Sequence, residues 1–207
     1  MTAVLDWAEH AAREFEPGYS ERPTWRRPGD LAAAIDPTTV QTPALDLIDD
    51  ALIDVAEGRC DRLIISMPPQ EGKSTRVTTT GPLWLLTRDP DLRIAVVSYA
   101  QDLAEEFGHA IRNHITSNSG DEGSLDLGLR IAPDNGAARR WSIDGRRGGV
   151  RSVGITGGLT GRPADVLFID DPFKSSKDAD SPTWREVVWK FWLSVANTRL
   201  APGAPVV

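Results

Sequence analysis

The chain has one cysteine, three histidines and no long apolar run. Because Cys60 is the only cysteine among 207 residues, an internal disulfide and a thiolate-rich zinc site are excluded. His109 and His114 are five residues apart and would not share one face of a helix, which argues against a histidine metal site. No apolar stretch approaches the roughly 20 residues of a membrane span, and the acidic N-terminus lacks the basic start of a secretory signal. We therefore expect a cytoplasmic protein that does not contact a membrane.

Positive charge is scarce overall but concentrated in one stretch. With 23 Lys and Arg against 30 Asp and Glu, the net charge of -7 argues against a protein that coats nucleic acid over its whole surface. The stretch 139–162 nevertheless contains only Asp144 among the acids, and six arginines: Arg139, Arg140, Arg146, Arg147, Arg151 and Arg162. Two interpretations stay open, namely a solvated arginine-rich hairpin and a local patch that holds DNA.

The length and the order of apolar segments predict one α/β domain. Residues 1–40 are rich in proline and glycine near their end and are expected to form a lead-in segment, followed by a domain over residues 41–207. Short continuous apolar runs predict strands that are buried on both faces, and helices are expected between them. The expected strands are 62–67, 93–99 and 165–170, and the expected helices are 42–58, one from about residue 72, 100–115, and one after residue 182. This alternation predicts a parallel sheet flanked by helices.

Three further details complete the expected fold. The helix over 42–58 should begin with Thr42 as N-cap and end at Gly58, with an apolar stripe of Leu45, Ile48, Leu52 and Val55. Residues 141–154 predict a β-hairpin insertion that turns at Asp144 and Gly145. A further strand should begin at residue 204.

The stretch "IISMPPQEGKST" (64–75) joins the first expected strand to a helix. Backbone amides at such a helix start can hold phosphate oxygens, while the Lys73 ammonium can reach the outer phosphates and the Ser74 hydroxyl can bind Mg²⁺. Met67 stands where the usual loop has its first glycine, so a chance Gly-Lys-Ser is the alternative. The residues that we expect to contact the nucleotide are Pro68, Pro69, Gln70, Glu71, Gly72, Lys73, Ser74 and Thr75.

Two adjacent acids follow a second buried segment in "DVLFIDDPF". A phosphate-binding loop requires a carboxylate at the end of a neighbouring strand to hold Mg²⁺, and a second acid that polarises the attacking water. Asp170 and Asp171 stand at these two places, although adjacent acids before Pro172 could also begin an ordinary turn. The preceding "GITGGLTGR" comes before a strand, so it is not a dinucleotide fingerprint, and we expect a loop that delivers Arg162 toward the nucleotide.

With these motifs in place, the chain resembles the large terminase subunit of tailed bacteriophages, specifically its N-terminal packaging ATPase. The resemblance runs from about residue 40 to the end, in six segments that occur in the same order. They are "RLIISMPPQEGKS", "GPLWLLTRDPD", "SYAQDLAEEFG", "GGLTGRPAD", "FIDDP" and "ADSPTWREVVWKF". The proline-proline loop is the form that this group uses, and the resemblance implies a P-loop NTPase core of the RecA/ASCE-like type.

The resemblance also implies a role for each site residue. Lys73 would be the phosphate lysine, while Ser74 and Asp170 would hold Mg²⁺. Asp171 would be the general base, and Gln41 lies where a glutamine that reads adenine would come. Arg162 is the first candidate for an arginine that reaches the ATP of a neighbouring subunit, with one of Arg139, Arg140, Arg146 or Arg147 as the second.

The implied function is an ATPase motor that drives viral DNA into the procapsid. Its expected partners are double-stranded viral DNA, the portal protein, the small terminase subunit and further copies in a ring, in the host bacterial cytoplasm and transiently at the procapsid portal. The coupling segment and the nuclease domain of the family are absent, so we expect an ATPase domain that is incomplete at its C-terminus and has no nuclease activity. The alternatives are a non-catalytic fragment that binds nucleotide or DNA, and half of a helicase-like ATPase.

Overall fold

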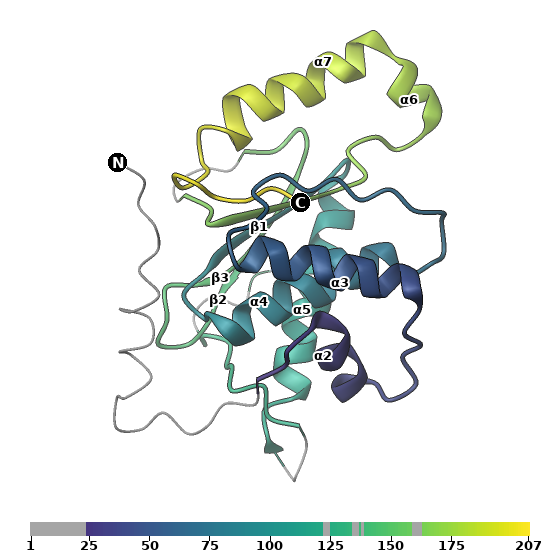
Figure 1. Ribbon diagram of the computed structural model, residues 1–207. Helices are drawn as coiled ribbons and strands as arrows, with labels where there is room; N and C mark the ends of the chain where they lie inside the picture. Colours follow the sequence, from purple (N-terminus) through teal and green to yellow (C-terminus); the bar gives the residue numbers. More distant parts are fainter. Residues whose placement is uncertain (1–23, 122–124, 134–136, 138, 159–162) are drawn as a thin grey trace.

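The computed structural model describes residues 24–121, 125–133, 137, 139–158 and 163–207 (Figure 1). In chain order, its elements are α2 (Pro28–Ile35), α3 (Pro43–Ala56), η1 (Thr75–Thr80), α4 (Gly81–Arg88), β1 (Arg93–Ser98), α5 (Gln101–Ser117), β2 (Arg140–Ser142), β3 (Gly149–Gly154), β4 (Val166–Asp170), α6 (Ser176–Asp180), α7 (Pro182–Phe191) and η3 (Trp192–Ala196). The expected helices over 42–58 and 100–115 are present as α3 and α5, and the expected strands 93–99 and 165–170 as β1 and β4, but in the described residues β2, β3 and β4 follow one another without a helix between them.

In the part of the chain that the structure describes, four strands form the sheet in the order β2-β3-β1-β4. Strand β1 is parallel to both β3 and β4, and only β2 is antiparallel to its neighbour. Near the C-terminus, Val206 adds parallel bridges to Leu167 of β4 and to Arg62. The parallel strands therefore end at one common edge of the sheet, the edge where ligands bind in open α/β folds.

Helices cover both faces of the sheet. On one face, strand residues such as Ile94 and Phe168 pack in a core with side chains of α3, α4 and α5. On the opposite face, Ala95 and Leu167 pack with residues of α7 and η3, which lie apart from the other helices in Figure 1. The expectation of a mostly parallel sheet flanked by helices is thus confirmed.

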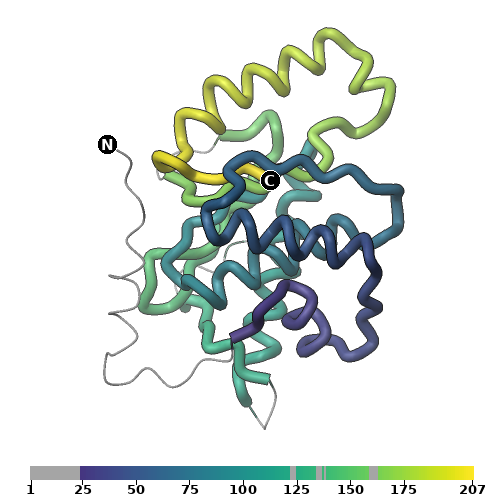
Figure 2. The backbone as a smooth tube through the Cα atoms, in the orientation of Figure 1, coloured from purple at the N-terminus to yellow at the C-terminus, as the bar shows by residue number. Residues whose placement is uncertain are grey.

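The first expected strand is wrong in its extent and in its burial. Residues 62–67 form one isolated bridge instead of a strand, and Ile64 is 95% exposed. Leu63, Ile65 and Met67 pack against the core, so the segment alternates between inward and outward side chains. It runs beside the C-terminal residues (Figure 2), where the amide of Leu63 donates to the carbonyl of Val206 at 2.9 Å. In the described part of the chain this segment lies at the margin of the sheet, and a continuous apolar run does not distinguish that position from a central one.

The hairpin around Asp144 and Gly145 is confirmed, but it is not an insertion beside the sheet. Its second strand, β3, pairs with β1 over six residues in parallel register, from Gly149 to Gly154. The burial of Val150 and Val153 on opposite faces explains this position, because a strand that is covered on both sides belongs inside a sheet.

The helix after the phosphate loop begins as expected but changes pitch. Between Thr75 and Thr80 it is a π-helix, and the amide of Gly81 donates to the carbonyl of Arg76, five residues back. Pro82 follows directly. Because proline has no N–H and its ring clashes with the carbonyl four residues earlier, a wider turn at this point accommodates it inside a continuous helical segment.

Helices α3 and α2 can be compared with the sequence predictions for residues 42–58 and 1–40. Thr42 caps α3 by accepting a hydrogen bond from the amide of Leu45, as predicted. Helix α2 lies in the stretch expected to be a lead-in segment, and its Leu31 is fully buried. Among the helices of the described residues, none is long and apolar enough to cross a membrane.

Candidate functional site

Lys73 meets two adjacent acids, which follow it by 97 and 98 positions in the sequence, at the carboxyl end of β4. The ammonium of Lys73 donates hydrogen bonds to Asp170 Oδ1 and to Asp171 Oδ1, both at 3.0 Å. Asp170 ends the buried strand β4 and is itself buried, whereas the Asp171 side chain is 64% exposed. The loop lysine and the two adjacent acids, which the sequence analysis identified separately, therefore form one cluster.

The electrostatics of this cluster keep the lysine charged. Burial of the Lys73 ammonium lowers its pKa, but hydrogen bonds to Asp170 and Asp171, together with attraction to their charges, outweigh burial. The pKa of Lys73 is therefore raised above its ordinary value, and the ammonium is protonated at neutral pH. The two carboxylates therefore stabilise a positive charge at this position, and one of them, Asp171, is exposed.

The backbone around the cluster contains three residues with left-handed φ values. Gln70 and Asp171 have φ of 66° and 42°, and Gly72 has φ of 82°. Non-glycine residues in this region are uncommon and concentrate at functional sites, where the surrounding structure holds them. Both sides of the cluster, the loop before Lys73 and the chain after β4, thus carry this conformation.

The loop itself is open to solvent and leads into a helix. Pro68, Pro69, Gln70, Glu71, Gly72 and Thr75 are exposed, while Lys73 and Ser74 are half-buried. The amide of Arg76 donates to the carbonyl of Gly72 at 2.9 Å, so the helix starts at the glycine. Free amides at the start of a helix, together with its positive dipole end, favour an anion such as phosphate.

The oxygen atoms at this edge of the sheet are suitable ligands for Mg²⁺. Two carboxylates and the hydroxyl of Ser74, the residue next to Lys73, are oxygen ligands of the kind that Mg²⁺ prefers. Among the residues that the structure describes, no group of three or more His, Cys, Asp or Glu is placed to hold a metal by itself. The site therefore fits a metal that takes most of its ligands from phosphate and water.

Gln41, the candidate adenine reader, lies in a pocket of about 280 Å³ between α2 and α3. Its amide donates to Asp46 at 3.1 Å and to Asp49 at 2.9 Å, and its oxygen accepts from Arg76 at 2.8 Å. Both amide hydrogens are thus engaged inside the protein. A base that bonded to this amide would have to replace the contact with Asp46, whose side chain is half exposed.

A buried ion pair next to Gln41 was not found in the sequence analysis. Arg76 donates to Asp49 Oδ1 at 2.6 Å, and the side chains of Arg76 and Asp49 are 3% and 0% exposed. Asp49 Oδ2 also accepts from the amide of Gly29 in α2 at 3.1 Å. A signal was present, because Asp49 lies on the apolar stripe of α3, four residues after Leu45. An acid on a buried stripe indicates a buried partner.

This polar network lies next to the phosphate loop. Arg76 follows Lys73 by three residues on the same helical segment, and a Cβ on Gly72 would contact the Leu45 side chain at 3.9 Å. The first turn of α3 and the pocket of Gln41 are therefore neighbours of the loop.

The candidate arginines that the structure describes form no printed contact with the Lys73 cluster. Arg162 lies outside the described residues. Arg139 is paired with Glu105 of α5 at 2.8 Å, and Arg146 lies 3.9 Å from Asp91, which precedes β1. Arg146 and Arg147 therefore lie at the amino ends of the parallel strands, opposite the edge that carries Lys73 of the same chain.

The chain is similar in sequence to a phage protein. No protein-family model matches the chain. The chain is 34% identical over 139 residues to the terminase large subunit of Enterobacteria phage T3. The matched stretch makes up 65% of this chain and 23% of the phage protein, so the chain spans less than a quarter of that relative's length. This partial similarity supports a relationship between the chain and the terminase large subunits.

Proposed function

We propose that the chain is a Mg²⁺-dependent ATPase of P-loop type that acts in the packaging of viral DNA. The observation that carries the proposal is the cluster of Lys73 with Asp170 and Asp171 at the carboxyl end of β4. The similarity to a phage terminase large subunit supports the packaging role. Double-stranded DNA, a portal protein, a small terminase subunit and further copies of the chain are the partners that this role requires.

Each residue of the cluster has a task in ATP hydrolysis. Lys73 would turn from the two carboxylates to the outer phosphates and neutralise the charge that develops on them. Asp170 and Ser74 would hold Mg²⁺, which supplies charge neutralisation between the β- and γ-phosphates. Asp171 is the exposed acid and would orient the attacking water and accept its proton. The loop amides from Gln70 to Thr75 would bind phosphate oxygens, and Gln41 would contact the base.

Replacing Lys73 with alanine tests the site. We expect Lys73→Ala to weaken Mg²⁺-dependent ATP binding by about ten- to a hundredfold, because a charge-assisted hydrogen bond contributes about 1.5–3 kcal/mol. Calorimetric titration of ATP measures this, with phosphate release followed in parallel. The matched control is Lys177→Ala, which removes an exposed lysine of α6. Equal ATP affinity in wild type and Lys73→Ala would contradict the proposal.

A non-catalytic nucleotide- or DNA-binding fragment is the main rival. Because a packaging motor receives an arginine from a neighbouring subunit, phosphate release per chain is expected to rise as the concentration of the chain increases. A binding fragment gives zero turnover at every concentration. Steady-state phosphate release over a wide range of chain concentrations separates the two, with sedimentation velocity to follow association. A helicase-like half would instead be indicated by separation of duplex strands.

A further inference from the structure

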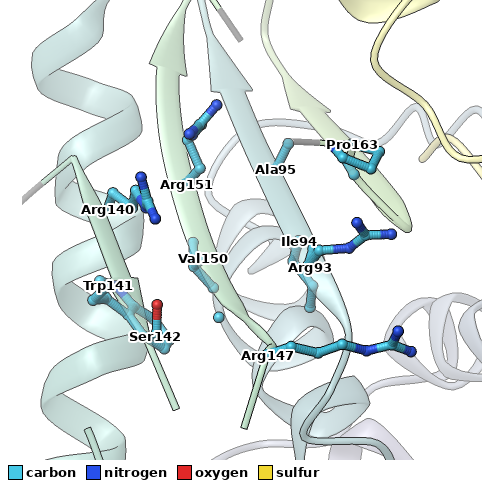
Figure 3. Close-up of a pocket in the computed structure, with 12 residues that line it drawn as sticks. Arg93, Ile94, Ala95, Arg140, Trp141, Ser142, Arg147, Val150, Arg151 and Pro163 are labelled. Atoms are coloured by element: carbon cyan, nitrogen blue, oxygen red, sulfur yellow. The ribbon is translucent and has the colours of Figure 1, made fainter. Parts of the chain in front are cut away.

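A pocket lined by arginines lies on the strands β1, β2 and β3, away from the Lys73 cluster. Of its 12 lining residues, four are arginines, namely Arg93, Arg140, Arg147 and Arg151, and none is an acid (Figure 3). The pocket is small, about 50 Å³, so it suits a single phosphate group along a larger ligand better than a whole organic molecule. In Figure 3, Arg93 and Arg147 extend toward the same side, while Arg140 and Arg151 stand on neighbouring strands.

The arginine pocket brings like charges close together. Arg140 and Arg151 are directly opposite each other in the antiparallel pair of β2 and β3, and like charges at such positions destabilise a sheet. Arg93 forms an ion pair with Asp165, because its Nε donates to Asp165 Oδ2 at 2.7 Å. In the described ranges, neither the Arg140 nor the Arg147 guanidinium forms an ion pair, although the neighbouring Arg139 and Arg146 do. A chain with a net charge of -7 thus concentrates positive charge here.

The extent of the arginine pocket favours a polyanion over a single triphosphate. Three neighbouring strands carry the arginines, which gives a width of about 10 Å at roughly 4.8 Å between strands. An arginine that completes the ATP site of a neighbouring subunit acts as one guanidinium at one γ-phosphate. Duplex DNA instead presents a charge for every ~1.7 Å of its axis, and the planar guanidinium fork matches its phosphate oxygens.

We propose that the arginine pocket binds the phosphate backbone of duplex DNA. That the polyanion is DNA rests on the proposed function. The charge and geometry of the arginine pocket are observed independently of that function. Arg93 begins β1 and Arg147 precedes β3, so these two lie at the amino ends of the parallel strands. DNA and nucleotide therefore bind at opposite ends of the same sheet and do not compete.

Salt-dependent DNA binding tests the site. A fluorescent duplex of about 30 base pairs is titrated with the chain, without nucleotide, at several salt concentrations. For the double variant Arg140→Ala/Arg147→Ala, the slope of log affinity against log salt is expected to fall by about 1.8, since each lost phosphate contact removes about 0.9. The matched control is Arg59→Ala/Arg185→Ala, which removes two exposed arginines elsewhere and changes the net charge equally. Its slope should stay that of the wild type.

Further variants separate the possible outcomes. Arg140→Lys/Arg147→Lys keeps the charge and should keep most of the slope, and thermal unfolding shows whether each variant is folded. Lys73→Ala should bind the duplex like wild type, so a failure of the ATP site leaves this result unchanged. A wild-type slope in Arg140→Ala/Arg147→Ala overturns the proposal. So does a variant that binds DNA normally but loses the rise of phosphate release with chain concentration, because the arginines then serve a neighbour's nucleotide.

Discussion

Asp171→Asn is expected to bind ATP like wild type and to release phosphate about 10²- to 10⁴-fold more slowly, the usual contribution of general-base catalysis. The amide has almost the shape of the carboxylate but cannot take a proton from water. Asparagine also tolerates the left-handed backbone that residue 171 adopts at φ of 42°, so the fold should not change. Its side-chain oxygen can still accept the hydrogen bond that Lys73 now donates to Asp171. Single-turnover phosphate release at saturating ATP measures the effect.

Two comparison variants make this result specific. Asp180→Asn removes a carboxylate that is 86% exposed, and turnover should not change. Asp170→Asn should instead raise the Mg²⁺ concentration needed for half-maximal turnover, because Asp170 is proposed as a metal ligand. If Asp171→Asn hydrolyses ATP at the wild-type rate, another group activates the water and the role proposed for Asp171 is wrong.

The parts of the site that the sequence predicted are those that depend on strand ends. An apolar run that stops at Asp170 determines where β4 leaves the sheet. The run before Gly-Lys-Ser is not a strand, but its bridge from Arg62 to Val206 is parallel, so the chain runs in the same direction as β4 before it enters the loop. Because parallel strands end at one edge, the two motifs are expected to meet. The Lys73 contacts with both acids agree with this expectation.

The parts that the sequence did not predict depend on which segments become neighbours. An apolar run such as 62–67 has the same composition in a central strand and at a margin, and only the 95% exposure of Ile64 tells them apart. The parallel pairing of β3 with β1 is likewise a long-range choice, because the hairpin turn at Asp144 and Gly145 determines only the local pairing with β2. Local patterns therefore predicted the elements better than the sheet order.

The network around Asp49 was missed for a related reason. Its members come from α2, Gln41, α3 and the helix after the loop, and of these only Asp49, on the apolar stripe of α3, indicated a buried partner by itself. Together they join the helix that carries Lys73 to the pocket of Gln41. The network therefore connects the proposed phosphate and base ends of the site. Loss of the network should lower ATP affinity as well as the free energy of unfolding.

Removal of Asp49 should have the largest effect on stability. We expect Asp49→Ala to lower the free energy of unfolding by about 3–5 kcal/mol, because it leaves the buried Arg76 guanidinium without its carboxylate. The side chains of Arg76 and Asp49 are 3% and 0% exposed, so water does not replace the lost partner. The amide of Gly29 also loses its acceptor. Urea denaturation followed by tryptophan fluorescence measures the change.

The neighbouring residue provides the control. Asp50 pairs with Arg27 at 2.7 Å, but its side chain is 64% exposed, so Asp50→Ala should cost no more than about 1 kcal/mol. The double variant Asp49→Leu/Arg76→Met replaces both charges with apolar side chains and should recover most of the stability lost in Asp49→Ala, since no buried charge is then unpaired. Recovered stability without recovered ATP affinity would show that the pair positions the loop helix and Gln41. If Asp49→Ala unfolds at the same urea concentration as Asp50→Ala, the ion pair does not hold these helices together.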